Sequence, residues 1–194
     1  MSSYLSSVIK QFEYYKMLGE KSFAQLSDDS LFLQFGQDNN SIAMIVKHLS
    51  ANMLSRFTAL MTTDGEKSWR NRDAEFEAWT PTRAEFLKVW NDGWQCLFDT
   101  LASLKQQDLE TIIYIRNEGH TVTEAINRQL SHYPYHIGQI VYIAKLISQD
   151  KWESLSIPKN KSVSYNQQKF EADPTVRHFT DEWLGKQKDR VNKE

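Results

Sequence analysis

The sequence has little of what many folds and sites require. It contains one cysteine, Cys96, with only seven glycines and four prolines among 194 residues. A single cysteine excludes an internal disulfide and any multi-cysteine zinc or iron–sulfur site. So few glycines and prolines argue against the many tight turns of a β-sandwich or β-barrel. No apolar run approaches the roughly 20 residues needed to cross a bilayer, and no secretory signal opens the chain. We therefore expect a cytoplasmic protein without a membrane partner.

An excess of charge of one sign is also missing. The chain has 23 lysines and arginines against 25 aspartates and glutamates, a net charge of −2. Because duplex-binding proteins usually carry a basic excess, we expect no nucleic-acid partner. Hydrophobic residues at 40% and charged residues at 25% are typical of a globular chain, and the length suffices to bury a core.

Four long segments carry apolar side chains at helical spacing, which predicts amphipathic helices. Thr82 and Thr121 are each followed three residues later by a glutamate, the capping-box pattern that begins a helix. Four helices with one polar face each most simply form a four-helix bundle, so the predicted fold class is all-α. The four segments span residues 2–27, 41–61, 82–104 and 121–147.

The predicted bundle, residues 1–150, has long connections and is followed by a C-terminal extension, residues 151–194. Residues 62–80 form a charge-rich loop that is longer than most bundle connections. Residues 111–116 are rich in β-branched side chains and predict either a short edge strand or a stiff linker. The extension is expected to be irregular except for a short helix near residues 174–188. Its aromatic side chains need cover, so we expect it to pack on the bundle or on a partner subunit.

Three histidines form the clearest candidate site. His132 and His136 are four residues apart, which places them on one helix face with Cβ atoms about 5–6 Å apart. Such a pair can bind one divalent ion, although histidines at this spacing are more often solvated or packed in a core. His48 has a comparable position in the second predicted helix. Three imidazoles would leave a fourth coordination position open, as in catalytic sites. Pro134 lies between two of them, and we expect a kinked but continuous helix.

Four segments of the chain together match the pattern of a known family: KHLSANMLSRF (47–57), TDGEKSWRNRD (63–73), EAINRQLSHYPYHIGQIVYIAKLI (124–147) and SLSIPK (154–159). They resemble the DinB-like (YfiT-like) superfamily of metal-binding bundles, in particular its uncharacterised bacterial branch with the TDGEK loop. The resemblance covers roughly residues 3–170. It implies a four-helix bundle with up-down-down-up connectivity, commonly dimeric, and a divalent metal, often nickel or zinc. By matching motifs, the metal ligands are His48, His132 and His136.

The resemblance also implies a range of functions. Characterised members include thiol-dependent enzymes such as bacillithiol S-transferases and mycothiol-dependent maleylpyruvate isomerase. We therefore expect a metal-dependent enzyme, similar to a thiol S-transferase or a hydrolase, that acts on a small molecule, with a low-molecular-weight thiol as a co-substrate of the transferase. The first alternative is a non-catalytic metal-binding protein of the stress-response or sensor type. The second is a dimerisation module whose histidines bind nothing. All three hypotheses predict a homodimer.

The remaining candidates are polar side chains near the histidines or in the long loop, and the pattern identifies no catalytic residue. Asn52, Gln129 and Gln139 can orient the ligands or touch substrate, and otherwise are ordinary polar residues. The loop acids can supply a base or are simply solvated; they are Asp64, Glu66, Asp73 and Glu75.

The other charged side chains have equally open interpretations. Arg56 and Arg128 can bind an anionic substrate or form salt bridges between helices. His120 and His178 have no partner at ligand spacing, and we expect them at the surface. Tyr133 stands where helical zinc peptidases have a glutamate, which argues against that chemistry.

Overall fold

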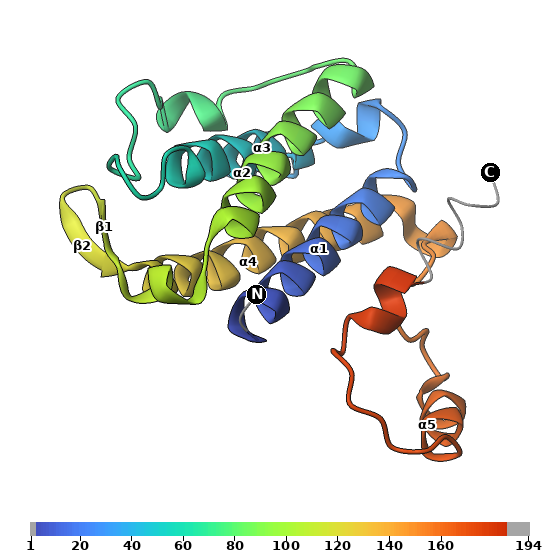
Figure 1. Ribbon diagram of the computed structural model, residues 1–194. Coiled ribbons are helices and arrows are strands. Elements are labelled where there is room, and N and C mark those ends of the chain that lie inside the picture. The colour runs from blue at the N-terminus through green and yellow to red at the C-terminus, as the bar shows by residue number, and fades with distance from the viewer. Residues whose placement is uncertain (1–2, 186–194) are drawn as a thin grey trace.

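The fold is mostly helical, and the computed structural model in Figure 1 describes residues 3–185. The helices are α1 (Ser3–Phe23), α2 (Ile42–Phe57), α3 (Arg83–Ser103), α4 (Val122–Ser148) and α5 (Ser162–Phe170). Short 3₁₀ turns cover Asp29–Phe32, Asp73–Phe76, Gln106–Glu110 and Gln149–Lys151. None of the helices described here combines the length and the apolarity needed to cross a membrane. The prediction of a mostly helical protein is confirmed.

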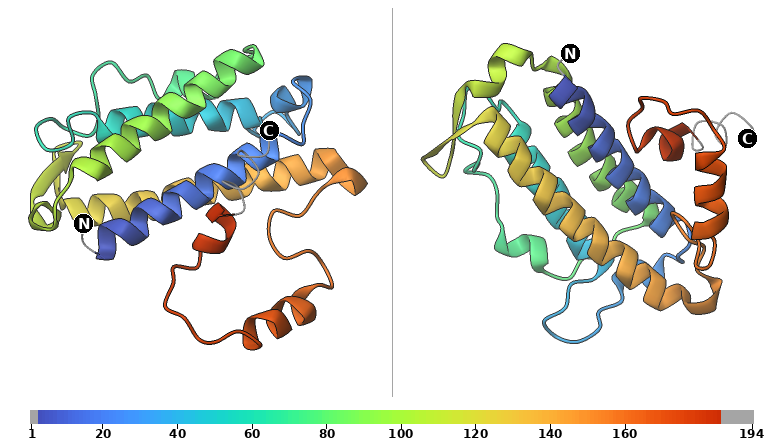
Figure 2. Two further views of the ribbon diagram at one scale, coloured as in Figure 1. Left: turned by 45° about the vertical axis from the view of Figure 1, so that its right-hand side comes forward. Right: turned by 90° about the horizontal axis from the view of Figure 1, so that it is seen from below.

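The four long helices share one hydrophobic core. α1 lies along α4 and α2 lies along α3, while α2 also touches α4 (Figure 2). Aromatic side chains from three helices meet at the centre: Phe12 of α1, Trp90 and Trp94 of α3, and Tyr133 of α4 are all buried. The same core includes buried side chains of α2, and it holds α2 against α4, the two helices that carry the candidate histidines.

The helices begin where their capping residues predict. Thr82 Oγ1 accepts a hydrogen bond from Glu85 N at 3.3 Å, and the Glu85 carboxylate accepts one from Thr82 N at 2.8 Å. Thr121 and Glu124 form the same reciprocal pair at the start of α4. Each pair satisfies backbone donors that the first helical turn leaves free. α4 then runs through Pro134 as one helix, which confirms the predicted continuity, so residues 132 and 136 stay on one face.

A β-hairpin leads into α4. Strand β1 (Ile112–Ile115) pairs antiparallel with β2 (Glu118–Thr121), so the extended segment 111–116 is a strand rather than a linker. Arg116 and Asn117 form the two-residue turn with φ of 56° and 61°, a conformation that L-residues rarely adopt. Asp64 stabilises it, because its carboxylate accepts hydrogen bonds from both backbone N–H groups, at 2.9 and 2.8 Å. These hydrogen bonds hold the pKa of Asp64 below its usual range and fasten the long loop to the hairpin.

The C-terminal segment differs from the prediction. Residues 162–170 are helical where irregular structure was expected, and residues 174–178 are not helical where a helix was expected. Residues 181–185 are helical, and the remaining predicted positions, 186–188, lie outside the described residues. The Asp173–Pro174 pair is a local signal, whereas contacts with residues distant in the sequence stabilise this segment.

Those contacts involve side chains far apart in the sequence. Tyr165 and Lys169 of α5 both bind the Glu182 carboxylate, the tyrosine at 2.9 Å. Asp181 accepts a hydrogen bond from His178 N at 3.0 Å and forms an ion pair of 2.7 Å with Lys10 of α1. The last helical turn therefore begins at Asp181, and the ion pair of this residue with Lys10 attaches the turn to α1.

The closeness of α2 and α3 yields a first testable prediction. A Cβ added to Gly93 would lie 2.7 Å from Ser50 Cα, and backbone cannot rotate away. We expect Gly93→Ala to destabilise the protein by about 1–3 kcal/mol in urea unfolding. Gly138→Ala is the matched control, because nothing lies within 4 Å of the added Cβ on α4; its expected effect is a gain of roughly 0.5–1 kcal/mol. Equal stability of the two variants would contradict the close approach.

Candidate metal centre

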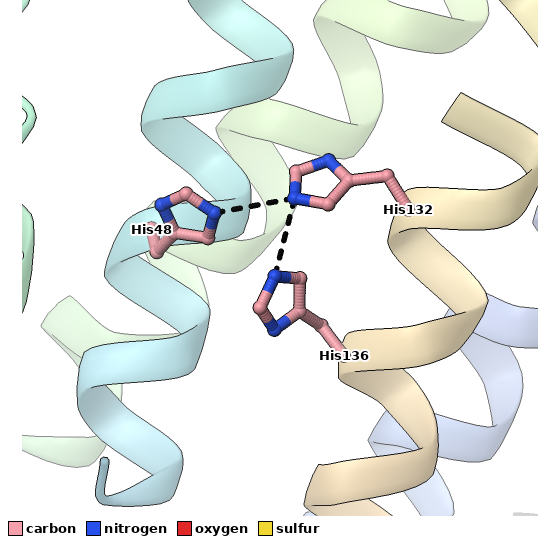
Figure 3. A group of neighbouring side chains, drawn as sticks. All are labelled: His48, His132 and His136. Carbon is pink, nitrogen blue, oxygen red and sulfur yellow. Dashed lines mark hydrogen bonds between the residues drawn. The ribbon is translucent and has the colours of Figure 1, made fainter. Parts of the chain in front are cut away.

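Three histidine side chains converge between α2 and α4. His48 of α2 is buried, whereas His132 and His136 lie one turn apart on α4 and are half-buried (Figure 3). The Nε2 atom of His132 is 3.3 Å from Nε2 of His48 and 3.1 Å from Nε2 of His136. Candidate ligand atoms from all three rings lie within 4.8 Å of one another. The structure thus brings together the three histidines that the sequence singled out.

Each of these rings has an oxygen acceptor at its other nitrogen. The Nδ1–oxygen distances are 2.8 Å for His48 and Glu75, 3.2 Å for His132 and Gln129, and 2.8 Å for His136 and Gln139. A carboxylate or amide oxygen can only accept, so each Nδ1 carries the hydrogen and donates it. In a neutral ring the lone pair then resides on Nε2. An oxygen partner at the distal nitrogen is the usual way in which proteins orient metal-binding histidines.

The protonation state of the rings fits a metal ion as well. Burial lowers the pKa of His132 to about 3, and the neighbouring His136 and His48 contribute in the same direction. Burial also lowers the pKa of His136, although its hydrogen bond with Gln139 opposes this effect. Both rings are therefore neutral at pH 7, the form that binds metals. Three lone pairs that face one another repel unless a cation lies between them, so this donor set suits a divalent ion.

The acceptor for His48 comes from the long loop. Glu75, in the 3₁₀ turn Asp73–Phe76, is 3% exposed. Its carboxylate accepts two hydrogen bonds from Arg70, at 2.7 and 3.0 Å, besides the one from His48. Burial alone raises the pKa of Glu75, but the bonds from His48 and Arg70 outweigh it, so the pKa lies below its ordinary value. Glu75 is thus an ionised positioning residue rather than a free base.

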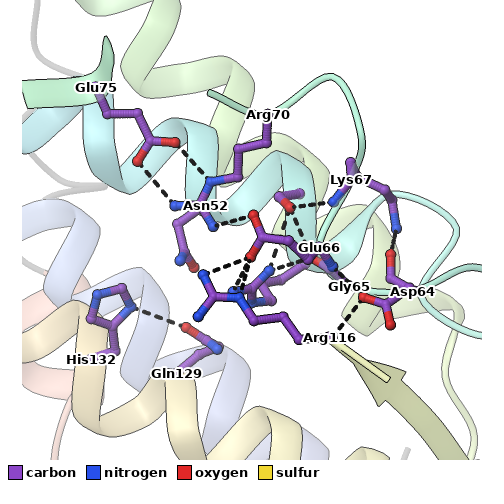
Figure 4. A network of polar contacts seen from close by, with 12 residues as sticks. Asn52, Asp64, Gly65, Glu66, Lys67, Arg70, Glu75, Arg116, Gln129 and His132 are labelled. Carbon is purple, nitrogen blue, oxygen red and sulfur yellow. Dashed lines mark hydrogen bonds and ion pairs between the residues drawn. The ribbon is translucent and has the colours of Figure 1, made fainter. Parts of the chain in front are cut away.

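A charged network continues from Arg70 towards the hairpin (Figure 4). The Glu66 carboxylate forms ion pairs with Arg56 at 3.0 Å, Arg116 at 3.0 Å and Arg70 at 3.6 Å. Arg56 is therefore engaged in an interaction within the protein, one of the two interpretations that the sequence allowed. The loop carboxylates were candidates for a base or for solvated groups. Those at positions 64, 66 and 75 all have internal partners, and the exposed Asp73 lies outside the cavity described next.

The Nε2 cluster opens into a cavity of about 430 Å³. Asn52 lies on its wall, and its side-chain oxygen accepts a hydrogen bond from Tyr133 at 3.0 Å instead of holding a histidine. Of the three amide side chains predicted near the site, only Gln129 and Gln139 therefore contact a histidine ring. The cavity is lined by His48, Asn52, Arg56, Arg70, Arg72, Phe76, Arg116, Arg128, Gln129, His132 and His136.

The other two histidines are outside this cluster, and the expectation that both are surface residues was wrong. His178 is half-buried and hydrogen-bonded to Ser7 of α1 at 3.0 Å and to Thr180 at 2.8 Å. His120 of β2 is half-buried as well, and its Nε2 is shielded from solvent. His120 lies within the hairpin and His178 lies at the C-terminal contact with α1. The spacing of residues along the sequence could not predict either environment.

Comparison with protein families gives a match over most of the chain. The sequence profile of the family described as Protein of unknown function (DUF1572) matches residues 1–161. Neither the curated proteins nor the solved structures contain a significant match to this chain. The matched range includes all three histidines, their oxygen partners and the whole cavity.

Proposed function

The chain belongs to the DUF1572 family, and from this premise and the histidine cluster we propose that it is a divalent-metal-dependent enzyme acting on a small molecule. Nickel or zinc is the proposed ion, held by His48, His132 and His136. The observation that carries the proposal is the convergence of three Nε2 lone pairs at the wall of a cavity. A structural metal site is usually closed by four protein ligands, whereas three ligands beside a cavity are typical of a catalytic one.

The chain's own groups favour thiol transfer over hydrolysis. A divalent ion in this site supplies a Lewis acid that lowers the pKa of a water or a thiol. Among the described residues no carboxylate lines the cavity, so the protein offers no general base there. The arginines around the cavity favour an ionised thiol by their charge. Gln129 and Gln139 hold two of the rings, and the Asn52 amide can donate a hydrogen bond to a substrate.

We also propose that the chain belongs to a wider superfamily and forms a homodimer. The mostly helical fold, with one histidine on α2 and two on α4, supports membership of the DinB-like superfamily and the up-down-down-up bundle that this implies. Exposed aromatic and aliphatic side chains on α4 support a homodimer, since they form an apolar face. They are Tyr135, Tyr142 and Leu146.

The enzymatic proposal is tested with the zinc- or nickel-loaded protein, a low-molecular-weight thiol and an electrophilic acceptor. We expect conjugation at least about tenfold faster than with the His48→Ala/His132→Ala/His136→Ala variant, equivalent to roughly 1.4 kcal/mol of barrier. His120→Ala, the same substitution outside the cavity, should retain the wild-type rate. No rate above the triple variant across several thiols would count against the transferase.

A metal-binding sensor is the second candidate function, and the position of the ligands favours it. They come from two helices, so a bound ion would tie α2 to α4 and convert metal availability into stability. Metal-dependent stability without turnover of any thiol or ester substrate would favour the sensor over the enzyme.

A further inference from the structure

The cavity beside the histidines carries an excess of positive charge. Only two carboxylates among the described residues, Glu66 and Glu75, form ion pairs with the arginines that line it. Five guanidinium groups against two carboxylates leave three positive charges uncompensated. Clefts lined by charge of one sign concentrate counter-ions. The lining arginines are Arg56, Arg70, Arg72, Arg116 and Arg128.

The uncompensated charge resides mainly on two of these side chains. Arg128 lies on α4 one turn before His132 and is exposed, and its side chain forms no hydrogen bond or ion pair with residues 3–185. Arg72 precedes the turn that carries Glu75, and its guanidinium carbon lies 5.2 Å from the centre of the Phe76 ring. In the described part of the chain it has no acidic partner. Both side chains line the cavity, on the α4 side and on the loop side.

Arg70, which also lines the cavity, has a guanidinium donor without a hydrogen-bond partner. The Arg70 side chain is 2% exposed, and its Nη1 atom has no hydrogen-bond partner in the described protein. The nearest carboxylate oxygen, on Glu66, is 3.6 Å away, beyond a good hydrogen bond. A buried guanidinium N–H without an acceptor is costly, so an oxygen atom of a ligand would relieve this site. Salt bridges within the protein engage Arg56 and Arg116. They leave the guanidinium groups of Arg72 and Arg128 and the Nη1 atom of Arg70 without a hydrogen-bond acceptor among the described residues.

We propose that the substrate is a small anion whose carboxylate or phosphate group binds Arg72 and Arg128 in this cavity, with Arg70 as a further donor. The planar guanidinium matches both oxyanions. The rest of the molecule then extends towards the three Nε2 atoms. This assignment rests on the proposed function, because it names the substrate class of the same site.

The test is calorimetric titration of zinc-loaded full-length protein at low salt with inorganic phosphate and, separately, with malonate. Low ionic strength limits screening of these charges. The Arg72→Gln/Arg128→Gln variant should bind both anions at least about tenfold more weakly. Arg177→Gln is the matched control, since this arginine is exposed and outside the cavity; it should bind like the wild type. Tighter binding of phosphate would assign a phosphate ester, and tighter binding of malonate a carboxylate.

Two results would overturn the inference: no binding of either anion to protein that carries its full zinc content, or equal affinity in the wild type and the double variant. The second result would mean that anions coordinate the ion without using the arginines. Zinc content measured on the same samples tests the metal centre separately from the substrate class. A protein that retains no zinc contradicts the metal centre, whereas normal zinc with unchanged anion affinity contradicts only the substrate class.

Discussion

Replacing Glu75 with alanine is expected to destabilise the protein by about 3–5 kcal/mol, the usual cost of removing one partner from a buried ion pair. The Arg70 guanidinium, 2% exposed, would lose the carboxylate that accepts two of its hydrogen bonds. His48 would lose the oxygen that fixes its Nδ1 hydrogen at 2.8 Å. Because such partners orient the ligand, zinc affinity should also fall by about 10–100-fold.

Urea unfolding and a zinc competition titration measure the two effects of this substitution. Glu77→Ala is the matched control, because Glu77 is an exposed glutamate of the same loop; its stability should change by no more than about 0.5 kcal/mol. Glu75→Gln retains an acceptor oxygen without the charge, so it should lie between the two in zinc affinity. Zinc affinity in Glu75→Ala equal to that of Glu77→Ala would show that the carboxylate does not position His48.

Zinc is expected to raise the melting temperature of the metal-free protein, and a chelator to reverse the shift. At free zinc 1,000 times the dissociation constant, binding to the folded state alone adds about 4.1 kcal/mol. For a domain of this size that corresponds to a shift on the order of 10 °C. The physical reason is that the three Nε2 lone pairs meet only in the folded chain, because His48 is 84 residues from His132.

Two single variants locate this effect. His48→Ala should abolish most of the zinc-induced shift, since two ligands of one helix remain, while His120→Ala should retain all of it. A shift of the same size in His48→Ala would mean that zinc stabilises the fold from another site. The comparison isolates the centre because His120 lies in β2, outside the cluster.

Local signals were sufficient to predict the four long helices and part of the site. The capping pairs at Thr82 and Thr121 depend on residues three positions apart, and α3 and α4 begin where those pairs indicate. His132 and His136 share a face because of helical periodicity, which holds even through Pro134. Gln129 and Gln139 are each three residues from the histidine that they hold, so helical spacing also explains these contacts.

The parts that were missed depend on tertiary contacts. Glu75 is 27 residues from His48, and the folding of the loop onto α2 selects it from the four loop acids that the sequence offered as candidates. The charge excess of the cavity became visible only when the ion pairs of Glu66 and Glu75 were known. Likewise α5 has no buried residues, and its side chains are held by Glu182 from the following segment.

Elemental analysis of untagged protein, beside the His48→Ala and His132→Ala variants, shows whether the three histidines bind a metal ion. We expect near-stoichiometric nickel or zinc in the wild type, or its uptake on addition, and loss of that metal in both variants. Metal retained in either variant would place the ion elsewhere. No metal in the wild type and no uptake of added nickel or zinc would contradict the three-histidine centre itself.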